Sequence, residues 1–285
     1  AWLGYPPAQT ELGRCLEFGT GVPQNIQQAV KWYRSAADNG NAPGQCCLGF
    51  LYETGEGVEQ NWREAVKWYR KAAELELSRA QCNLAWCYEH GKGVEKNEKR
   101  ALAWYQKAAD QGDPRGMYCV GRAYDYGRGT ERDIKAAVGW YQKAAEAGSV
   151  SAMCDLGVCY ERGEGVEQNL EKAVELYRRA AERGDAIGQC NLGHMYESGR
   201  GVAKDWVQAA KWYGAAAEQG SPRAQYHLAW CYEHAAGVQQ DLTKALALYE
   251  AAAAQQYEDA EKQVQRLRKP PEKGKFLRGL FGRHG

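Results

Sequence analysis

Apolar and small residues recur along the chain with a period of 36 residues, and the first half of each period has the pattern of a helix. An aliphatic residue is followed at once by a glycine or alanine and, four residues later, by a tyrosine or leucine. The aliphatic members are Leu12, Leu48, Leu84, Val120, Leu156, Leu192 and Leu228. Residues four apart share one face of an α-helix, so the pattern predicts a first helix with a continuous apolar face.

The second half of each period predicts another helix. It opens on an Asn or Asp, whose side chain accepts hydrogen bonds from the unpaired amides of a helix start. The predicted N-caps are Asn25, Asn61, Asn97, Asp133, Asn169, Asp205 and Asp241. In the first period Ala29, Trp32, Tyr33 and Ala36 follow at the i, i+3, i+4, i+7 spacing of a buried helical stripe.

A Gly-x-Gly-Val turn separates the two helices in most periods, as at residues 19–22 and 55–58. Glycine adopts the positive φ that ends a helix without the strain that a side chain adds. The expected fold is all-α: a right-handed α-α superhelix, or solenoid, of seven 36-residue helix-turn-helix repeats with a C-terminal capping helix. A single hairpin cannot cover its own apolar stripe, so the repeats must stack into one domain over residues 1–268. The expected repeats are residues 8–43, 44–79, 80–115, 116–151, 152–187, 188–223 and 224–256, with a cap at 257–268.

The pattern Ala-x-x-x-Leu-Gly-x-x-Tyr-x-x-Gly-x-Gly-Val, then Asp/Asn-x-x-x-Ala-x-x-Trp-Tyr-x-x-Ala-Ala, resembles the Sel-1-like subclass of tetratricopeptide-type repeats. Residues 191–217 are a near-complete example, and the resemblance covers about residues 8 to 255. It implies an adaptor, because known members hold other proteins together in eukaryotic membrane-protein degradation and in bacterial signalling, envelope processes and host interaction. The expected function is therefore a non-catalytic scaffold or adaptor that binds a protein or peptide. It also implies an alternative, a secreted or envelope-associated protein that binds peptidoglycan or a β-lactam, as proposed for cysteine-rich relatives.

Three columns of the first helix vary freely between repeats and point away from the predicted core. In related solenoids the first helices line the concave surface, so this stripe is the candidate partner-binding face. The candidates are Arg14, Phe50, Asn83, Trp86, His90, Arg122, Tyr126, Arg162, Asn191, His194, His227, Trp230 and His234. Large aromatic, Arg and His side chains combine contact area with hydrogen bonding, as binding hot spots do. The alternative is a solvent-facing stripe that drifts without function, against which Trp86 and Trp230 argue.

Two further features of the first helix have competing interpretations. By analogy with tetratricopeptide grooves, Asn83 and Asn191 are placed to hold the backbone of a bound peptide. An acidic residue closes every first helix: Glu17, Glu53, Glu89, Asp125, Glu161, Glu197 and Glu233. A negative charge opposes the macrodipole at a helix C-terminus, so helix stability does not explain the column. Pairing with Arg or Lys of a neighbouring repeat is the favoured explanation, and an acidic ridge for a basic partner is the alternative.

Composition narrows the class of partner. The net charge of +1 gives no field for nucleic acid, and no partner of that kind is expected. No apolar stretch approaches the roughly 20 residues of a spanning helix, so we expect no integral membrane segment. The basic segment 269–285 is expected to be disordered; a membrane surface or a neighbouring groove is the alternative contact.

All ten cysteines fall on predicted first helices, where they are interpreted as reduced packing residues, which favours a cytoplasmic location. A periplasmic or secreted location and cross-repeat disulfides, such as one between Cys15 and Cys46, remain alternatives. His194, His227, Cys231 and His234 form a weak candidate for a zinc site. No nucleophile or phosphate-loop motif is present, so no enzyme activity and no cofactor are expected.

Overall fold

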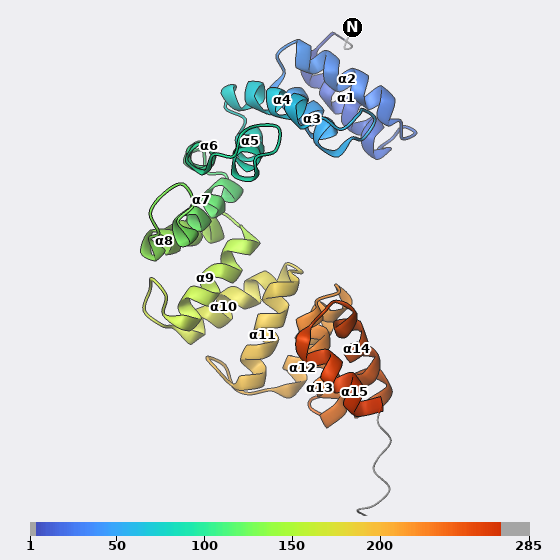
Figure 1. The fold of residues 1–285 in the computed structure, drawn as a ribbon, viewed down its shortest axis with the longest axis vertical. Helices are drawn as coiled ribbons and strands as arrows, with labels where there is room; N and C mark the ends of the chain where they lie inside the picture. Colours follow the sequence, from blue (N-terminus) through green and yellow to red (C-terminus); the bar gives the residue numbers. More distant parts are fainter. Residues whose placement is uncertain (1–3, 269–285) are drawn as a thin grey trace, which may run out of the picture. The chain divides into compact units, whose positions relative to one another are not determined.

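The computed structural model describes residues 4–268, and every regular element in that range is an α-helix. The first helices of the seven repeats are α1 (Pro6–Phe18), α3 (Ala42–Thr54), α5 (Ser78–His90), α7 (Pro114–Tyr126), α9 (Val150–Arg162), α11 (Ala186–Ser198) and α13 (Pro222–His234). The second helices are α2 (Ile26–Asp38), α4 (Trp62–Glu74), α6 (Glu98–Asp110), α8 (Ile134–Glu146), α10 (Leu170–Glu182), α12 (Trp206–Glu218) and α14 (Leu242–Ala254). The capping helix α15 spans Glu258–Arg268. The all-α, seven-repeat architecture is confirmed (Figure 1).

The predicted N-caps of the second helices are confirmed. Each of the seven Asn or Asp side chains accepts a backbone N–H from the first turn of its helix; Asn61, for example, accepts from residues 63 and 64. The predicted turn glycines also adopt a positive φ, 70° at Gly19 and 73° at Gly21. In the seventh repeat Ala235 takes the same left-handed conformation, with a φ of 55°.

The first helices begin two residues before the predicted repeat boundaries, and five of the seven have a side-chain N-cap of their own. Asn41, Asp113 and Asp185 each accept a backbone N–H from the residue three positions on, and Ser149 and Ser221 do the same. Prolines at the first or second helical position add a preset φ in α1, α3, α7 and α13.

The chain divides into two compact units, with the division in the sequence between Gln168 and Asn169. Unit 1 contains α1 to α9 and unit 2 contains α10 to α15, so the fifth repeat spans the division. In the other six repeats the two helices pack against each other as a hairpin. The prediction of one continuous domain over residues 1–268 stays a prediction, and the predicted basic tail, 269–285, lies outside the described residues.

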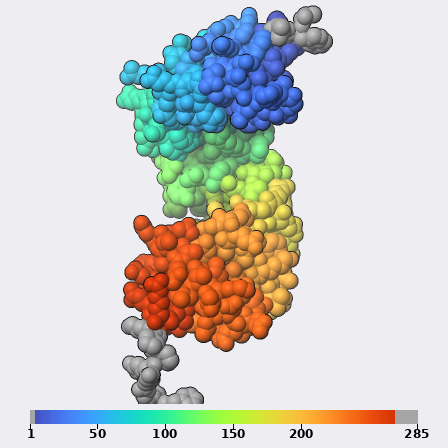
Figure 2. Space-filling model, turned by 90° about the vertical axis from the view of Figure 1, so that its right-hand side faces the viewer, coloured from blue at the N-terminus to red at the C-terminus, as the bar shows by residue number. Residues whose placement is uncertain are grey.

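Within unit 1 the first helices lie on the inner side of the bend that successive repeats make (Figure 1). The first helices α1 and α3, and likewise α5 and α7, approach each other more closely than neighbouring second helices do. Consecutive repeats of this unit form a continuous surface, from blue to green in Figure 2. The variable stripe of unit 1 therefore lies on first helices, which are close to one another in these two pairs.

In the six repeats that lie within one unit, a tyrosine from the second helix fills the centre of the hairpin. Tyr33, Tyr69, Tyr141, Tyr213 and Tyr249 are fully buried. In most hairpins the ring lies against a glycine of the first helix: a Cβ added to Gly49 would meet the ring of Tyr69 at 2.8 Å, and one on Gly121 would meet Tyr141 at 2.7 Å. The small residue that follows each aliphatic residue therefore leaves the space that the tyrosine ring occupies.

Candidate protein-binding face

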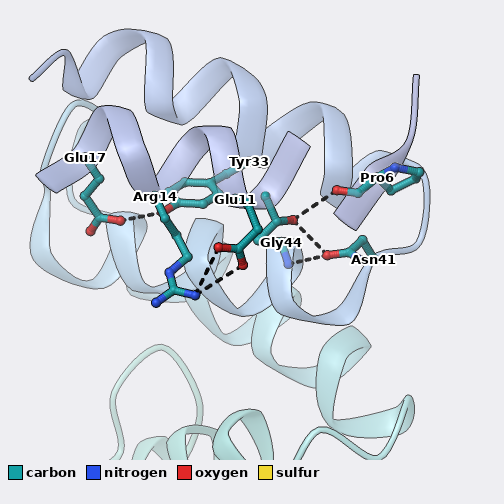
Figure 3. Close-up of polar contacts among 8 residues, drawn as sticks. Pro6, Glu11, Arg14, Glu17, Tyr33, Asn41 and Gly44 are labelled. Atoms are coloured by element: carbon teal, nitrogen blue, oxygen red, sulfur yellow. Dashed lines mark hydrogen bonds and ion pairs between the residues drawn. The ribbon is translucent and has the colours of Figure 1, made fainter. Parts of the chain in front are cut away.

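The acidic column at the end of the first helices is a set of acceptors for the buried tyrosines. In the six repeats that lie within one unit, the tyrosine hydroxyl donates to the carboxylate 16 residues earlier; the bond from Tyr105 to Glu89 is 3.0 Å long. Figure 3 shows the first of these, from Tyr33 to Glu17. Burial raises the pKa of each tyrosine, and the neighbouring carboxylate raises it further, so the phenol keeps the proton that it donates.

Neither interpretation of the acidic column was complete. Pairing with a basic residue of the following element does occur: Arg128 Nη1 lies 2.8 Å from Glu89, for example, and Arg266 of α15 pairs with Glu233. The bond to the tyrosine of the same repeat is the general function, and it turns these carboxylates inward. An acidic ridge for a basic partner is not supported.

Two of the candidate tryptophans are the centres of three-ring stacks built by consecutive repeats. In unit 1, Trp86 stacks on Trp62 of the preceding second helix, with ring centroids 5.7 Å apart, and on His90, 4.4 Å away. In unit 2, Trp230 stacks in the same way on Trp206, at 5.0 Å, and on His234, at 4.3 Å.

The sequence projection placed these tryptophans away from the core, whereas the structure has them half-buried at its edge. The stacking fixes their rings, and His90 and His234 at the open end of each stack are exposed. Each stack therefore presents a preorganised aromatic edge to solvent.

The two candidate asparagines are each held by an arginine from the next repeat. Arg115 Nη1 donates to Asn83 Oδ1 at 2.9 Å, and Arg223 Nη1 donates to Asn191 Oδ1 at 3.0 Å. The bridge fixes the amide oxygen, so the remaining donor of each side chain is its NH₂ group; that of Asn83 lies 3.9 Å from Cys46 Sγ. The suggested backbone clamp is not tested by this geometry.

The remaining candidates of unit 1 are separate from the stacks. Arg14 is exposed and pairs with Glu11 one turn before it, at 3.2 Å (Figure 3). Phe50 is half-buried. The Arg122 guanidinium lies over the rings of Tyr118 and Tyr126, 5.9 and 5.5 Å from their centroids, and Arg162 is exposed 3.7 Å from Glu164.

In unit 2, His227 belongs to a polar cluster between α11, α12 and α13. Its Nδ1 lies 3.3 Å from Glu197, its ring stacks on Tyr213 with centroids 4.9 Å apart, and His194 approaches it edge-on. Burial alone would raise the pKa of Glu197, but the hydrogen bonds from His227 and Tyr213 hold that pKa below its ordinary value.

The four residues considered as a zinc site are not brought together. Cys231 is fully buried in the core, His227 pairs with Glu197, and His234 stacks on Trp230 with its Nδ1 3.0 Å from the Trp230 carbonyl. Residues 4–268 contain no group of three or more His, Cys, Asp or Glu side chains arranged to hold a metal ion. The prediction from the i, i+4, i+7 spacing did not take into account that Cys231 lies on the buried face of its helix.

All ten cysteines are free thiols on first helices, and seven of them are buried. Burial raises the pKa of Cys46, Cys87 and Cys231 to about 12. These thiols therefore stay protonated at neutral pH and pack as small apolar side chains, as the sequence indicated. None of the described helices has the length and apolar character that a membrane-spanning helix requires.

The residues that complete the face from a neighbouring repeat were not predicted from the sequence; they are Trp62, Trp206, Arg115 and Arg223. The two arginines occupy one column, 32 residues after their asparagines, and the two tryptophans are 144 residues apart, four periods. A search for pairs of columns that carry matching residues in the same two repeats would have found both sets.

Comparison with known proteins supports the repeat assignment throughout. The Sel1 repeat profile matches seven consecutive segments: residues 6–41, 42–77, 78–113, 114–149, 150–185, 186–221 and 222–257. These segments begin where the first helices begin. No curated protein sequence matches the chain significantly.

Three of the similar solved structures illustrate the likeness. A protective antigen of uropathogenic Escherichia coli strains is 38% identical over 93% of this chain, with a TM-score of 0.80, and this chain spans only 56% of that protein. A Sel1 repeat protein from Oxalobacter formigenes is 33% identical, with a TM-score of 0.75, over 86% of this chain and 96% of its own length. An immunity protein from Pseudomonas aeruginosa, 24% identical with a TM-score of 0.50 over 81% of this chain and 89% of its own, shares the fold alone. The chain belongs to the Sel1 repeat family, whose members are typically non-catalytic scaffolds.

Proposed function

We propose that this protein is a non-catalytic scaffold that binds a protein or peptide partner through the exposed parts of its first helices. The observation that carries the proposal is the pair of Trp-Trp-His stacks, which end in Trp86 with His90 and in Trp230 with His234. Each stack is built by two repeats, is fixed by ring contacts, and leaves an aromatic edge at the surface.

Fixed aromatic side chains suit binding because little conformational entropy is lost when a partner covers them. Tryptophan is also the residue most enriched among interface hot spots. The same seven residues, Leu-Ala-Trp-Cys-Tyr-Glu-His, occur at 84–90 and at 228–234, so the chain offers one kind of contact twice.

The test is a capture experiment with the purified full chain and an extract of its source cells. The double variant His90→Ala/His234→Ala removes the exposed ring of each stack, and Trp86→Ala/Trp230→Ala removes the centre. Trp104→Ala/Trp212→Ala is the matched control, because these half-buried tryptophans lie on second helices, one in each unit. Circular dichroism must show that all three variants keep their helices.

We expect both stack variants to lose a partner that the wild type and the control variant retain. Equal capture by all four proteins would mean that the stacks only hold repeats together. The absence of a nucleic-acid partner is tested in parallel, with a salt-dependent shift assay on the same samples, for which we expect no shift.

The location that we propose is a reducing, cytoplasmic compartment. Its support is the set of cysteines that pack as protonated thiols on the first helices. Ten free thiols in freshly isolated protein, counted under denaturing conditions, are the expected result.

A further inference from the structure

Two first helices of unit 1 carry an arginine that has no carboxylate partner. Arg79 is the second residue of α5 and Arg115 is the second residue of α7, and both are exposed. Arg115 donates to the neutral Asn83 amide, and within residues 4–268 no carboxylate lies within ion-pair distance of either guanidinium. The two occupy the same column, one repeat apart.

Their position is unfavourable for the helices that carry them. The amino end of a helix has the positive end of the macrodipole, which repels a cation in the first turn. Neither arginine contributes to capping, which Asp113 provides in α7 by accepting the backbone N–H groups of residues 115 and 116. Helix stability therefore does not account for this column.

The carboxylates of this surface are engaged by groups other than these arginines. Glu89 is turned inward onto Tyr105 and Arg128, Asp113 caps α7, and Asp155 accepts a hydrogen bond from Tyr118 at 2.9 Å. Two turns along α7, Arg122 adds a third positive charge, held between two tyrosine rings. Within residues 4–268, the α5–α7 surface thus has three arginines that form no ion pair, in a molecule whose net charge is only +1.

We propose that this surface, defined by Arg79, Arg115 and Arg122, binds an acidic segment of the partner protein. The inference rests on the proposed function and specifies the chemistry of the partner at one part of the face. Asn83 orients the Arg115 guanidinium, and an oriented guanidinium binds a carboxylate through two parallel hydrogen bonds. His90 and Trp86 lie at the other end of α5, where an apolar residue of the same segment would rest.

The spacing of the helices sets the spacing of the acidic residues. Packed helices lie roughly 8–10 Å apart, and an extended chain advances about 3.3 Å per residue. Two carboxylates that bridge Arg79 and Arg115 are therefore expected about three residues apart in the bound segment. A bound helix would instead place them at i and i+7, since its rise is about 1.5 Å per residue.

The test is a selection from a display library of random nonapeptides on the immobilised full chain. We expect enrichment of Asp or Glu at two positions about three residues apart. The best peptide and its Gln analogue are then labelled, and binding is measured by fluorescence anisotropy at two salt concentrations. Arg79→Ala/Arg115→Ala should lower the affinity for the acidic peptide at least tenfold. The control Arg63→Ala/Lys99→Ala removes two exposed charges from second helices of the same unit and should leave that affinity unchanged.

Selected peptides without acidic enrichment, or equal affinity of the acidic peptide and its Gln analogue, would overturn the proposal. If a single-stranded oligonucleotide of the same charge binds more tightly than the peptide, and this binding depends on Arg79, the surface recognises phosphate groups. That result would also overturn the proposal. If the captured partner is lost from the stack variants but kept by Arg79→Ala/Arg115→Ala, the proposed function stands and this inference fails.

Discussion

The hydroxyl of Tyr105 in α6 donates a 3.0 Å hydrogen bond to Glu89 in α5, and Glu89 is held from its other side by Arg128 of the next repeat. One carboxylate thus joins the two helices of a hairpin and the hairpin to its successor. Because Glu89 is largely shielded and Tyr105 is buried, removal of either partner leaves a polar group that water reaches poorly.

Tyr105→Phe is expected to lower the free energy of unfolding by about 1.5–3 kcal/mol, the usual range for a hydrogen bond to a charged group. Urea denaturation, followed by circular dichroism, measures this change in the free energy of unfolding. Tyr126→Phe is the control, since the Tyr126 side chain is exposed, and it should change stability by less than about 0.5 kcal/mol. A double-mutant cycle between Glu89 and Arg128 should give a smaller coupling, on the order of 0.5–1 kcal/mol, because Arg128 is partly exposed. Equal losses in Tyr105→Phe and Tyr126→Phe would contradict the role of the bond.

Two glycines of the fourth repeat are expected to respond oppositely to alanine. A Cβ on Gly121 would lie 2.7 Å from the ring of Tyr141, so Gly121→Ala should destabilise the protein by about 1–3 kcal/mol. Gly139, on the exposed side of α8, has nothing within 4 Å of its Cβ position, and Gly139→Ala should stabilise it by about 0.5–1 kcal/mol. Thermal unfolding of both variants beside the wild type provides the comparison, and a shift in the same direction for both would refute the packing argument.

The stability contributed by Glu197 is expected to depend on pH. Its folded-state pKa is depressed, so the contribution is present above the ordinary pKa of 4.5 and is lost as the pH falls through the lower folded value. Glu197→Gln should therefore be less stable than the wild type at pH 7, and the difference should shrink at pH 3. Urea titrations of both proteins at these pH values test this. An undiminished difference at pH 3 would show that the carboxylate charge is not what matters.

The cysteines are expected to react slowly in the native protein. With a pKa near 12 rather than 9, Cys46, Cys87 and Cys231 have about a thousandfold less thiolate at pH 8. Ellman's reagent should find ten thiols in denaturant and only a minority within minutes under native conditions. A denatured count of eight or fewer would reveal disulfides such as one between Cys15 and Cys46, and would argue for an oxidising compartment.

The helices were predictable because their signals are local. The N-caps of the second helices and the glycines of the turns act within a few residues, and a fixed period repeats them seven times. The first helices begin earlier than the predicted repeat boundaries, and caps such as Asn41, Asp113 and Asp185 had not been considered in the sequence.

The candidate face was only partly predictable because its contacts join successive repeats. Asn83 and Trp86 were identified from their columns, but the arginine and tryptophan that hold them come from adjacent hairpins. Which columns meet depends on the angle at which hairpins stack, and periodicity does not contain that angle. The acidic column was only partly interpreted for a related reason. Its pairing with basic residues was predicted, but its tyrosine donors had already been assigned to the core, where their hydroxyl groups were not considered.

At the C-terminal end of unit 2, α15 takes the place that a further hairpin would occupy. Arg266 pairs with Glu233 as Arg128 pairs with Glu89, and Val264 packs on Tyr249 and Ala245. The last hairpin therefore makes with α15 the same kinds of contact, one charged and one apolar, that it would make with a following repeat. A repeat surface left open would be free to pack against the first hairpin of another copy and to grow into fibres, and α15 covers that surface on the last hairpin.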